Sequence, residues 1–171
     1  MLIFLTGFMG SGKSTIGLQL AEALEIGFWD LDQLIQDQEG RSISEIFDQD
    51  GQRYFRKIER DTLRELPVKL EGDAVIATGG GTPCYYDNAQ VLNMMGTCIY
   101  LDLEPEHLYQ RLSEENEGRP LIANKSKEEI SKIIEEMLHE RIPFYLAATY
   151  KVDANRSVEA IVQQILYLLN E

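Results

Sequence analysis

The residues with the clearest chemical meaning form one short segment, Gly7–Ser14 (GFMGSGKS), which fits the phosphate-loop pattern G-x-x-x-x-G-K-[ST] at every fixed position. Glycines let backbone N–H groups turn inward around phosphate oxygens, and the start of the following helix adds partial positive charge. Lys13 is placed to reach the β- and γ-phosphates, and the Ser14 hydroxyl is placed to ligate Mg²⁺. A glycine-rich turn that matches by chance is the alternative. We expect a nucleoside triphosphate to bind through Gly10, Ser11, Gly12, Lys13, Ser14 and Thr15.

Two carboxylates, Asp30 and Asp32, end the second candidate strand, at the edge of an α/β sheet where ligands bind. Alternation along a strand would put both side chains on the same side. One can help to hold Mg²⁺, usually through water, and the other can orient or deprotonate an acceptor hydroxyl. The alternative is that Asp32 only caps the helix that follows it. The neighbouring phosphate loop favours function.

A run of three glycines follows the third candidate strand, in Thr78–Pro83 (TGGGTP). Three consecutive glycines are costly in chain entropy, and a tight turn needs only one or two. The run therefore suggests that a ligand approaches the backbone closely, with a plain loop as the alternative.

Several arginines stand out in a chain with few cations. Arg53, Arg56 and Arg60 share one helix face, with Glu59 beside Arg56, and a solvated, salt-bridged surface stripe is the ordinary interpretation. Arg141 ends a long amphipathic helix and is weak evidence by itself. Phe47 and Phe55 are more typical of a hydrophobic core than of a pocket. His107 and His139 each lie on a predicted helix with no plausible partner, so we expect both to be surface residues without a catalytic role.

Strand and helix patterns alternate throughout, which predicts an α/β domain with a mainly parallel sheet. The capping boxes Ser42/Glu45 and Ser126/Glu129 mark two helix starts. Candidate strands are Leu2–Thr6, Gly27–Leu31, Ala74–Thr78, Thr97–Leu101 and Tyr150–Val152. Candidate helices are Lys13–Leu24, Asp32–Glu39, Ser44–Asp48, Gln52–Leu66, Asn88–Met94, Pro105–Ser113, Lys127–Leu146 and Val158–Leu169.

Composition narrows the class of protein. A chain of 171 residues predicts one domain, 1–171. The net charge of −13 disfavours nucleic acid and anionic membranes as partners. No run approaches a membrane span, and the strand that leads into the phosphate loop leaves no room for a signal peptide. Cys84 and Cys98 are expected to be ordinary thiols in a reducing cytoplasm.

The segment Glu114–Asn124 joins two strong helices without clear periodicity. A polar surface loop is one interpretation. A mobile lid is the other, because loops over phosphate sites often carry an arginine and close on the substrate.

The order of these motifs resembles the shikimate kinase family over nearly the whole chain. The phosphate loop alone indicates only a nucleotide, whereas the ordered set D-x-D, F-R-x-x-E, G-G-G, R-P-L and R-x-P-x-Y is highly specific. The matching segments are Gly7–Ser14, Asp30–Asp32, Gly40–Ile43, Ile46–Phe47, Phe55–Glu59, Thr78–Gly81, Arg119–Leu121 and Arg141–Tyr145. Leu31 departs from the family, which more often has Ser or Thr there, and it should point away from the site.

The resemblance implies roles for individual residues. Shikimate would be held by Asp32, Arg56, Gly80 and Arg141, with the arginines on its carboxylate and Asp32 on its reacting hydroxyl. The pocket would be completed or supported by Gly79, Gly81, Phe47, Phe55, Glu59, Pro120 and Leu121. Ser14 and Asp30 would serve Mg²⁺, and Arg119 would bridge the substrate and the transferring phosphoryl group. Arg111 and the segment around Asn155, Arg156 and Ser157 would face adenine.

The implied architecture is a P-loop kinase fold of three layers, with a five-stranded parallel sheet in the order 2-3-1-4-5. An acceptor-binding helical region would span about 32–66 and a mobile lid about 114–124. The implied reaction transfers a phosphoryl group from MgATP to the 3-hydroxyl of shikimate, by a cytoplasmic monomer with Lys13, Asp32 and Arg119 as catalytic residues. One rival is another small-molecule kinase of this fold, such as a gluconate or nucleoside monophosphate kinase. A nucleotide-binding module without catalysis is the other.

Overall fold

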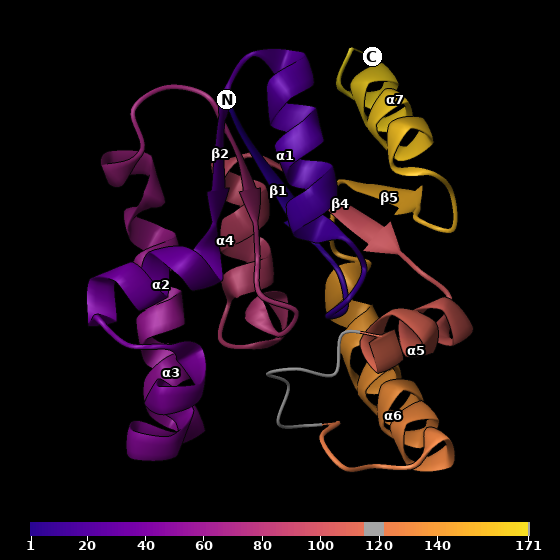
Figure 1. The fold of residues 1–171 in the computed structure, drawn as a ribbon. Helices are drawn as coiled ribbons and strands as arrows, with labels where there is room; N and C mark the ends of the chain where they lie inside the picture. Colours follow the sequence, from indigo (N-terminus) through magenta and orange to yellow (C-terminus); the bar gives the residue numbers. More distant parts are fainter. Residues whose placement is uncertain (115–121, 171) are drawn as a thin grey trace.

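Strands and helices alternate along residues 1–114 and 122–170, the part of the chain that a computed structural model describes (Figure 1). The strands are β1 Leu2–Thr6, β2 Gly27–Asp30, β3 Ala74–Ala77, β4 Thr97–Asp102 and β5 Tyr150–Asp153. The helices are α1 Lys13–Leu24, α2 Leu31–Glu39, α3 Ile43–Lys69, α4 Asn88–Met95, α5 Pro105–Glu114, α6 Lys127–Tyr145 and α7 Val158–Leu169, with a short 3-10 helix, η1, at Thr82–Cys84. All five predicted strands are confirmed.

The strands form one parallel sheet in the order β2-β3-β1-β4-β5, as the family resemblance implied. The register pairs Leu5 with Ala77 and Thr6 with Tyr100, so the carboxyl ends of the inner strands meet at one edge. The phosphate loop, the Asp30 end of β2 and the glycine run all leave the sheet at this edge. Ligands of open parallel sheets bind at that edge.

Helices cover both faces of the sheet, which gives three layers, and an apolar core lies between the sheet and the helices on each face. Ile3 and Leu5 pack with residues of α1, α5, α6 and α7, whereas Phe4 packs with residues of α2, α3 and α4. Successive strand residues point to opposite faces, so a continuous apolar strand is buried on both sides. This accounts for the unbroken apolar run at the start of the chain.

Helix α3 is two helical segments that meet at Gly51, whose φ of 79° and ψ of 175° are not helical. A positive φ favours glycine, which has no Cβ to clash. The two helices predicted from the sequence, Ser44–Asp48 and Gln52–Leu66, are these segments. The rings of Phe47 and Phe55, one on each side of Gly51, pack with their centroids 4.7 Å apart. Both predicted capping boxes are confirmed.

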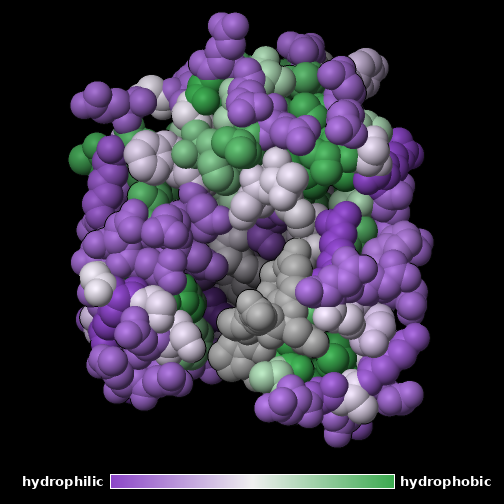
Figure 2. All heavy atoms as spheres, in the orientation of Figure 1, coloured by the Kyte–Doolittle hydropathy of each residue, from purple (hydrophilic) through white to green (hydrophobic). Residues whose placement is uncertain are grey.

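The face drawn in Figure 2 is mostly hydrophilic and is hollowed near its centre, between the side that carries α2 and α3 and the side that carries α5 and α6. Throughout the described ranges, every helix is too short or too polar to cross a membrane.

Candidate active site

The phosphate loop runs from the end of β1 into α1, as predicted, and Gly12 caps the helix in a left-handed conformation, with φ 91°. The side chain of Lys13 is buried and lies back over the loop, where its Nζ donates to the carbonyl oxygens of Gly7 and Phe8, both at 2.9 Å. The Oγ of Ser11 is buried and lacks a hydrogen-bond partner in the part of the chain described. A fixed cation and an unsatisfied hydroxyl at a helix N-terminus suit phosphate oxygens.

An open pocket of about 740 Å³ lies beside this loop (Figure 2). Its walls come from the phosphate loop and α1, the junction of β2 and α2, the glycine run, and helices α3, α5 and α7. Ten residues that the sequence analysis assigned to the site line it: Gly10, Gly12, Lys13, Ser14, Thr15, Asp30, Asp32, Gly79, Gly80 and Arg111.

Asp30 is the last residue of β2, and it holds two groups at once. Its Oδ2 accepts the Ser14 hydroxyl at 2.8 Å, and its Oδ1 accepts the backbone N–H groups of Asp32 and Gln33 at the start of α2. The capping residue is therefore Asp30, and the alternative that Asp32 caps this helix is wrong. The expectation that both carboxylates alternate along one strand is also wrong, because Asp32 lies in the first turn of α2.

Asp32 is partly buried at the edge of this pocket, and its Oδ1 is buried with no hydrogen-bond partner within the described ranges. Burial, then the charges of Glu59 and Asp30, raise its pKa from 3.8 to about 6, while Lys13 and Arg56 pull it down. The pKa rises because the loss of hydration and the repulsion by the two carboxylates together outweigh the attraction by the two cations. A carboxylate with a pKa near neutrality and an open acceptor atom is suited to receive a proton.

Arg56 forms an ion pair with the fully buried Glu59: its Nη1 lies 2.7 Å from Oε2, and only 11% of the Arg56 side chain is exposed. The Thr82 hydroxyl donates to Oε1 of Glu59 at 2.6 Å. The Nε of Arg56 is buried without a partner in the described part of the chain, so this guanidinium has a donor left for a second acceptor. The surface-stripe interpretation is wrong for Arg56. It holds better for Arg53, which is exposed, and Arg60, which pairs at the surface.

The glycine run lets these side chains come close to the backbone. A Cβ on Gly79 would lie 2.9 Å from Oδ1 of Asp32, and a Cβ on Gly81 would lie 2.5 Å from Nη2 of Arg56. Any larger residue at either position would push the neighbouring charged group away. The close approach that we expected from a ligand is made here by side chains, and approach by a ligand stays a prediction.

Arg141, near the end of α6, lies beside the middle glycine of the same run. A Cβ on Gly80 would lie 3.6 Å from its Nη1, and its guanidinium carbon lies 5.6 Å from the ring centroid of Phe8 in the phosphate loop. One helical turn later, the Tyr145 hydroxyl donates to the carbonyl oxygen of Gly80 at 2.6 Å. The structure therefore brings Arg141 and Arg56 to neighbouring glycines, although they are far apart in the sequence.

A second hollow, of about 260 Å³, lies between α5 and the segment after β5. Arg111 lines both hollows, and its Nη1 donates to the carbonyl oxygen of Gly10 at 3.2 Å. Asn155 and Arg156 line the second hollow too. The residues predicted to face adenine thus gather next to the phosphate loop, except Ser157, whose side chain caps α7.

His107 also lines the second hollow, and the prediction that it has no plausible partner is wrong. Its Nδ1 lies 2.7 Å from Oδ1 of Asn155. That oxygen also accepts the Glu104 N–H, and the Asn155 amide nitrogen donates to Asp153, so the amide orientation is fixed. Neutral His107 therefore carries its proton on Nδ1 and presents Nε2 as an acceptor. No local pattern in the sequence pairs residues this far apart.

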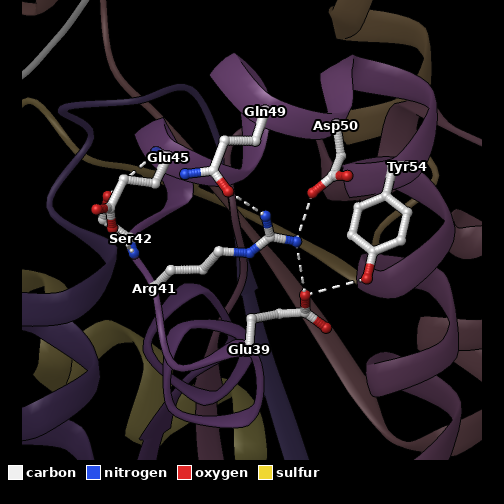
Figure 3. Close-up of polar contacts among 7 residues, drawn as sticks. All are labelled: Glu39, Arg41, Ser42, Glu45, Gln49, Asp50 and Tyr54. Atoms are coloured by element: carbon white, nitrogen blue, oxygen red, sulfur yellow. Dashed lines mark hydrogen bonds and ion pairs between the residues drawn. The ribbon is translucent and has the colours of Figure 1, made fainter.

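A group of polar side chains, which we call the Arg41 cluster, joins α2 to both segments of α3 (Figure 3). Arg41 donates to Gln49 at 2.9 Å and contacts Glu39 at 3.1 Å and Asp50 at 2.5 Å. Tyr54, beyond the kink, donates to Glu39 at 3.1 Å. The hydrogen bond to Glu39 raises the pKa of both Arg41 and Tyr54. The motif at Gly40–Ile43 matched the family, but the sequence did not reveal this role.

Loss of the Arg41 cluster should loosen the wall of the main pocket, because Ile43 and Asp32 lie on the two elements that the cluster joins. We expect Arg41→Met to lower the thermal unfolding midpoint and to raise the KM for the acceptor only roughly two- to fivefold, since ion pairs that solvent still reaches are individually weak. Arg53→Met, at an exposed position on α3, is the matched control. Equal effects of both variants would remove any specific role for Arg41.

Three residues assigned to the site, Arg119, Pro120 and Leu121, lie outside the described residues, as does most of the predicted lid. Their roles stay predictions. Among the residues that are described, no group of three or more His, Cys, Asp or Glu side chains is placed to hold a metal ion.

Comparison with known proteins gives a consistent result over the full chain. A family model described as shikimate kinase matches residues 9–170. The shikimate kinase of Bacteroides fragilis is 40% identical over 173 residues, which cover 98% of this chain and 96% of that protein. The shikimate kinase of Flavobacterium johnsoniae is 42% identical over 169 residues, covering 98% of each.

Solved structures agree with the sequences. The shikimate kinase of Bacteroides thetaiotaomicron has a TM-score of 0.93 at 36% identity, covering 100% of this chain and 99% of that one. The Acinetobacter baumannii shikimate kinase, solved in complex with shikimate, has a TM-score of 0.88 at 34% identity, covering 98% and 92%. The fold, the phosphate loop and the full-length matches lead to one conclusion: this chain belongs to the shikimate kinase family.

Proposed function

We propose that this protein phosphorylates the 3-hydroxyl of shikimate with ATP, giving shikimate 3-phosphate and ADP. The observation that carries the proposal is a pair of buried atoms of opposite character beside one glycine run, the acceptor Oδ1 of Asp32 and the donor Nε of Arg56. Asp32 suits a hydroxyl and Arg56 suits a carboxylate, and shikimate carries both groups. Membership of the shikimate kinase family supports this acceptor.

In this proposal Asp32 orients the acceptor hydroxyl and receives its proton. The pKa of about 6 makes Asp32 a better base than an exposed aspartate, and it is still mostly ionised at neutral pH. Arg56 and Arg141 bind the carboxylate from two helices, which fixes the ring of the acceptor against Asp32. Glu59 holds Arg56 in place from the core side.

At the phosphate end, Lys13, whose side chain is buried, neutralises charge on the β- and γ-phosphates. The Ser14 hydroxyl and the Asp30 carboxylate, 2.8 Å apart, are hard oxygen donors of the kind that Mg²⁺ prefers. They fit an ion that keeps its other positions for waters and phosphate oxygens. When bound there, Mg²⁺ would neutralise charge that develops during transfer. Arg119 is proposed to add a further positive charge.

We further propose that the base of ATP occupies the second hollow, because Arg111 lines both this hollow and the main pocket. Arg111, Asn155 and Arg156 are the residues proposed to contact adenine. Both cysteines are free thiols, which fits the proposal of a cytoplasmic enzyme. A monomer that binds neither nucleic acid nor membranes completes the proposal.

A coupled assay of ADP release tests the acceptor directly. With MgATP, the purified protein should release ADP when shikimate is present and very little without it. Gluconate, AMP and a reaction without acceptor are the comparisons, because the first two distinguish related kinases of the same fold. Equal ADP release with and without shikimate would refute the proposal.

The two arginines provide a test of where the acceptor binds. Each should contribute a charge-assisted hydrogen bond, so Arg56→Ala or Arg141→Ala should raise the shikimate KM roughly ten- to a hundredfold. ADP binding, measured by calorimetry, should be nearly unchanged. Lysine at either position should restore only part of the loss, because an ammonium keeps the charge but not the planar fork. If ADP binding falls as much as shikimate binding, the acceptor site is placed wrongly.

A further inference from the structure

Tyr85, just after η1, lies against the guanidinium of Arg56. The guanidinium carbon is 4.0 Å from the ring centroid, the closest contact of a cation with an aromatic ring in the described parts of this chain. The ring of Phe55 lies 5.0 Å from the same carbon. Tyr85 does not belong to any motif that the sequence analysis singled out, and the proposed mechanism has not used it.

We propose that Tyr85 is a positioning residue for acceptor binding, which acts by holding Arg56 in the orientation that presents its free donors to a carboxylate. This inference rests on the proposed function, because it assigns a carboxylate to Arg56. The N–H groups of a guanidinium lie in its plane, whereas an aromatic ring contacts its face. A ring can therefore restrain the plane of Arg56 without using any of its five donors.

The restraint matters because Arg56 has a competing partner in the core. One nitrogen, Nη1, already contacts the buried Glu59 at 2.7 Å, while Nε stays without a partner in the described residues. Without a ring against its face, the guanidinium could rotate to place two nitrogens on Glu59, since arginine and carboxylate favour the bidentate pair. That rotation would remove donors from the acceptor site.

Tyr85 is itself held in place by the helix that carries Arg56. The Gln52 side-chain amide donates to the Tyr85 hydroxyl at 2.6 Å. Gln52 lies one helical turn before Arg56 on the same face of α3. Gln52 therefore contacts the hydroxyl of Tyr85 while Arg56 contacts its ring face. Near the other end of η1, Thr82 donates to Glu59. The η1 segment and α3 thus form a closed set of contacts around Arg56.

Steady-state kinetics of three variants test the proposal. Tyr85→Leu should raise the shikimate KM about five- to tenfold, with kcat within about twofold and the ATP KM unchanged. Tyr85→Phe and Gln52→Leu each keep the ring but remove its hydrogen bond to α3, so each should raise the shikimate KM only about two- to threefold. Unfolding midpoints of all variants check that the fold is intact.

The neighbouring residue offers a matched control. Tyr86 lies over Arg60, 4.8 Å from its guanidinium carbon, but Arg60 pairs at the surface and has no role in the site. Tyr86→Leu should leave every kinetic constant unchanged. A shikimate KM that rises equally in Tyr85→Leu and Tyr86→Leu would show a general effect of the loop and overturn the proposal, as would an unchanged KM in Tyr85→Leu.

A double-mutant cycle separates positioning from simple structural support. If Tyr85 acts through Arg56, adding Tyr85→Leu to Arg56→Ala should change kcat/KM for shikimate by less than about 1.5-fold. A full five- to tenfold loss in that background would mean that the ring acts independently of Arg56. Failure of the wild type to release ADP with shikimate would instead refute the proposed function itself, so the two failures are distinguishable.

Discussion

Replacing Lys13 with Ala should reduce kcat roughly 10²-fold or more at saturating ATP while the protein stays folded, because a preorganised charge contact to a transition state is worth about 3 kcal/mol. Lys13 is already desolvated: its side chain is buried, and its Nζ lies on the carbonyl oxygens of Gly7 and Phe8. The free-energy cost of desolvating and orienting the Lys13 ammonium group is therefore part of folding and is not incurred when the nucleotide binds. That arrangement is expected of a group that stabilises developing charge rather than the ground state.

The assay compares Lys13→Ala with Lys132→Ala, which removes an exposed lysine from a surface pair of α6. Only the first should lose turnover, and thermal unfolding should show that both variants fold. Near-normal kcat in Lys13→Ala would contradict the assignment. A rise in the ATP KM with kcat unchanged would show that Lys13 contributes equally to binding of the ground state and the transition state.

The phosphate loop could be predicted from the sequence because all of its determinants are contiguous. A strand, a glycine-rich turn and a helix follow one another within a few residues, and each has a local signal. The sheet order is a different case. Alternating elements predict a parallel sheet, but the order 2-3-1-4-5 came from the family resemblance and was confirmed by the strand pairing.

The positions of the two aspartates could be predicted from local patterns, but their relative orientation could not. The sequence identified Asp30 and Asp32 but not their geometry, because the geometry depends on where β2 ends. The strand ends at Asp30 since its carboxylate accepts the next two available N–H groups of α2 and the Ser14 hydroxyl. Asp32 is thereby released from capping, and its Oδ1 is left buried without a partner in the described residues.

Some contacts between distant segments could not be predicted, either from local patterns or from the family resemblance. His107 meets Asn155, and Tyr85 meets Arg56, only after the sheet has brought their helices and loops together. Each of these residues has an ordinary type in an ordinary local pattern. Its role arises from a partner on another element, which a single sequence does not reveal.

Asp32→Asn should produce the other large effect, a loss of roughly 10²-fold or more in kcat/KM, because general-base catalysis by a side chain contributes about that much. The pH dependence should change as well. In the wild type, kcat/KM should rise with pH through about 6, where Asp32 loses its proton and becomes able to accept one. In Asp32→Asn this limb should disappear. Retention of the same limb in the variant would assign it to another group.

The same substitution should make the protein more stable at neutral pH. The pKa of Asp32 is about 6 in the folded protein against an ordinary value of 3.8, so the folded state binds this proton more tightly than the unfolded state does. The favourable contribution is complete below pH 4 and is lost as pH rises through 6. Ionised Asp32 therefore costs the folded state about 3 kcal/mol at neutral pH.

Denaturant unfolding of the two proteins at pH 4 and pH 7.5 measures this cost. Asp32→Asn should exceed the wild type in free energy of unfolding at pH 7.5, and the difference should shrink at pH 4, where the wild-type carboxyl is protonated too. Asp48→Asn, at an exposed position on α3, should show neither effect. A stability gain combined with a loss of turnover would mean that the fold tolerates an unfavourable buried charge for the sake of the proton transfer. A gain that is the same at both pH values would mean that ionisation of Asp32 is not its cause.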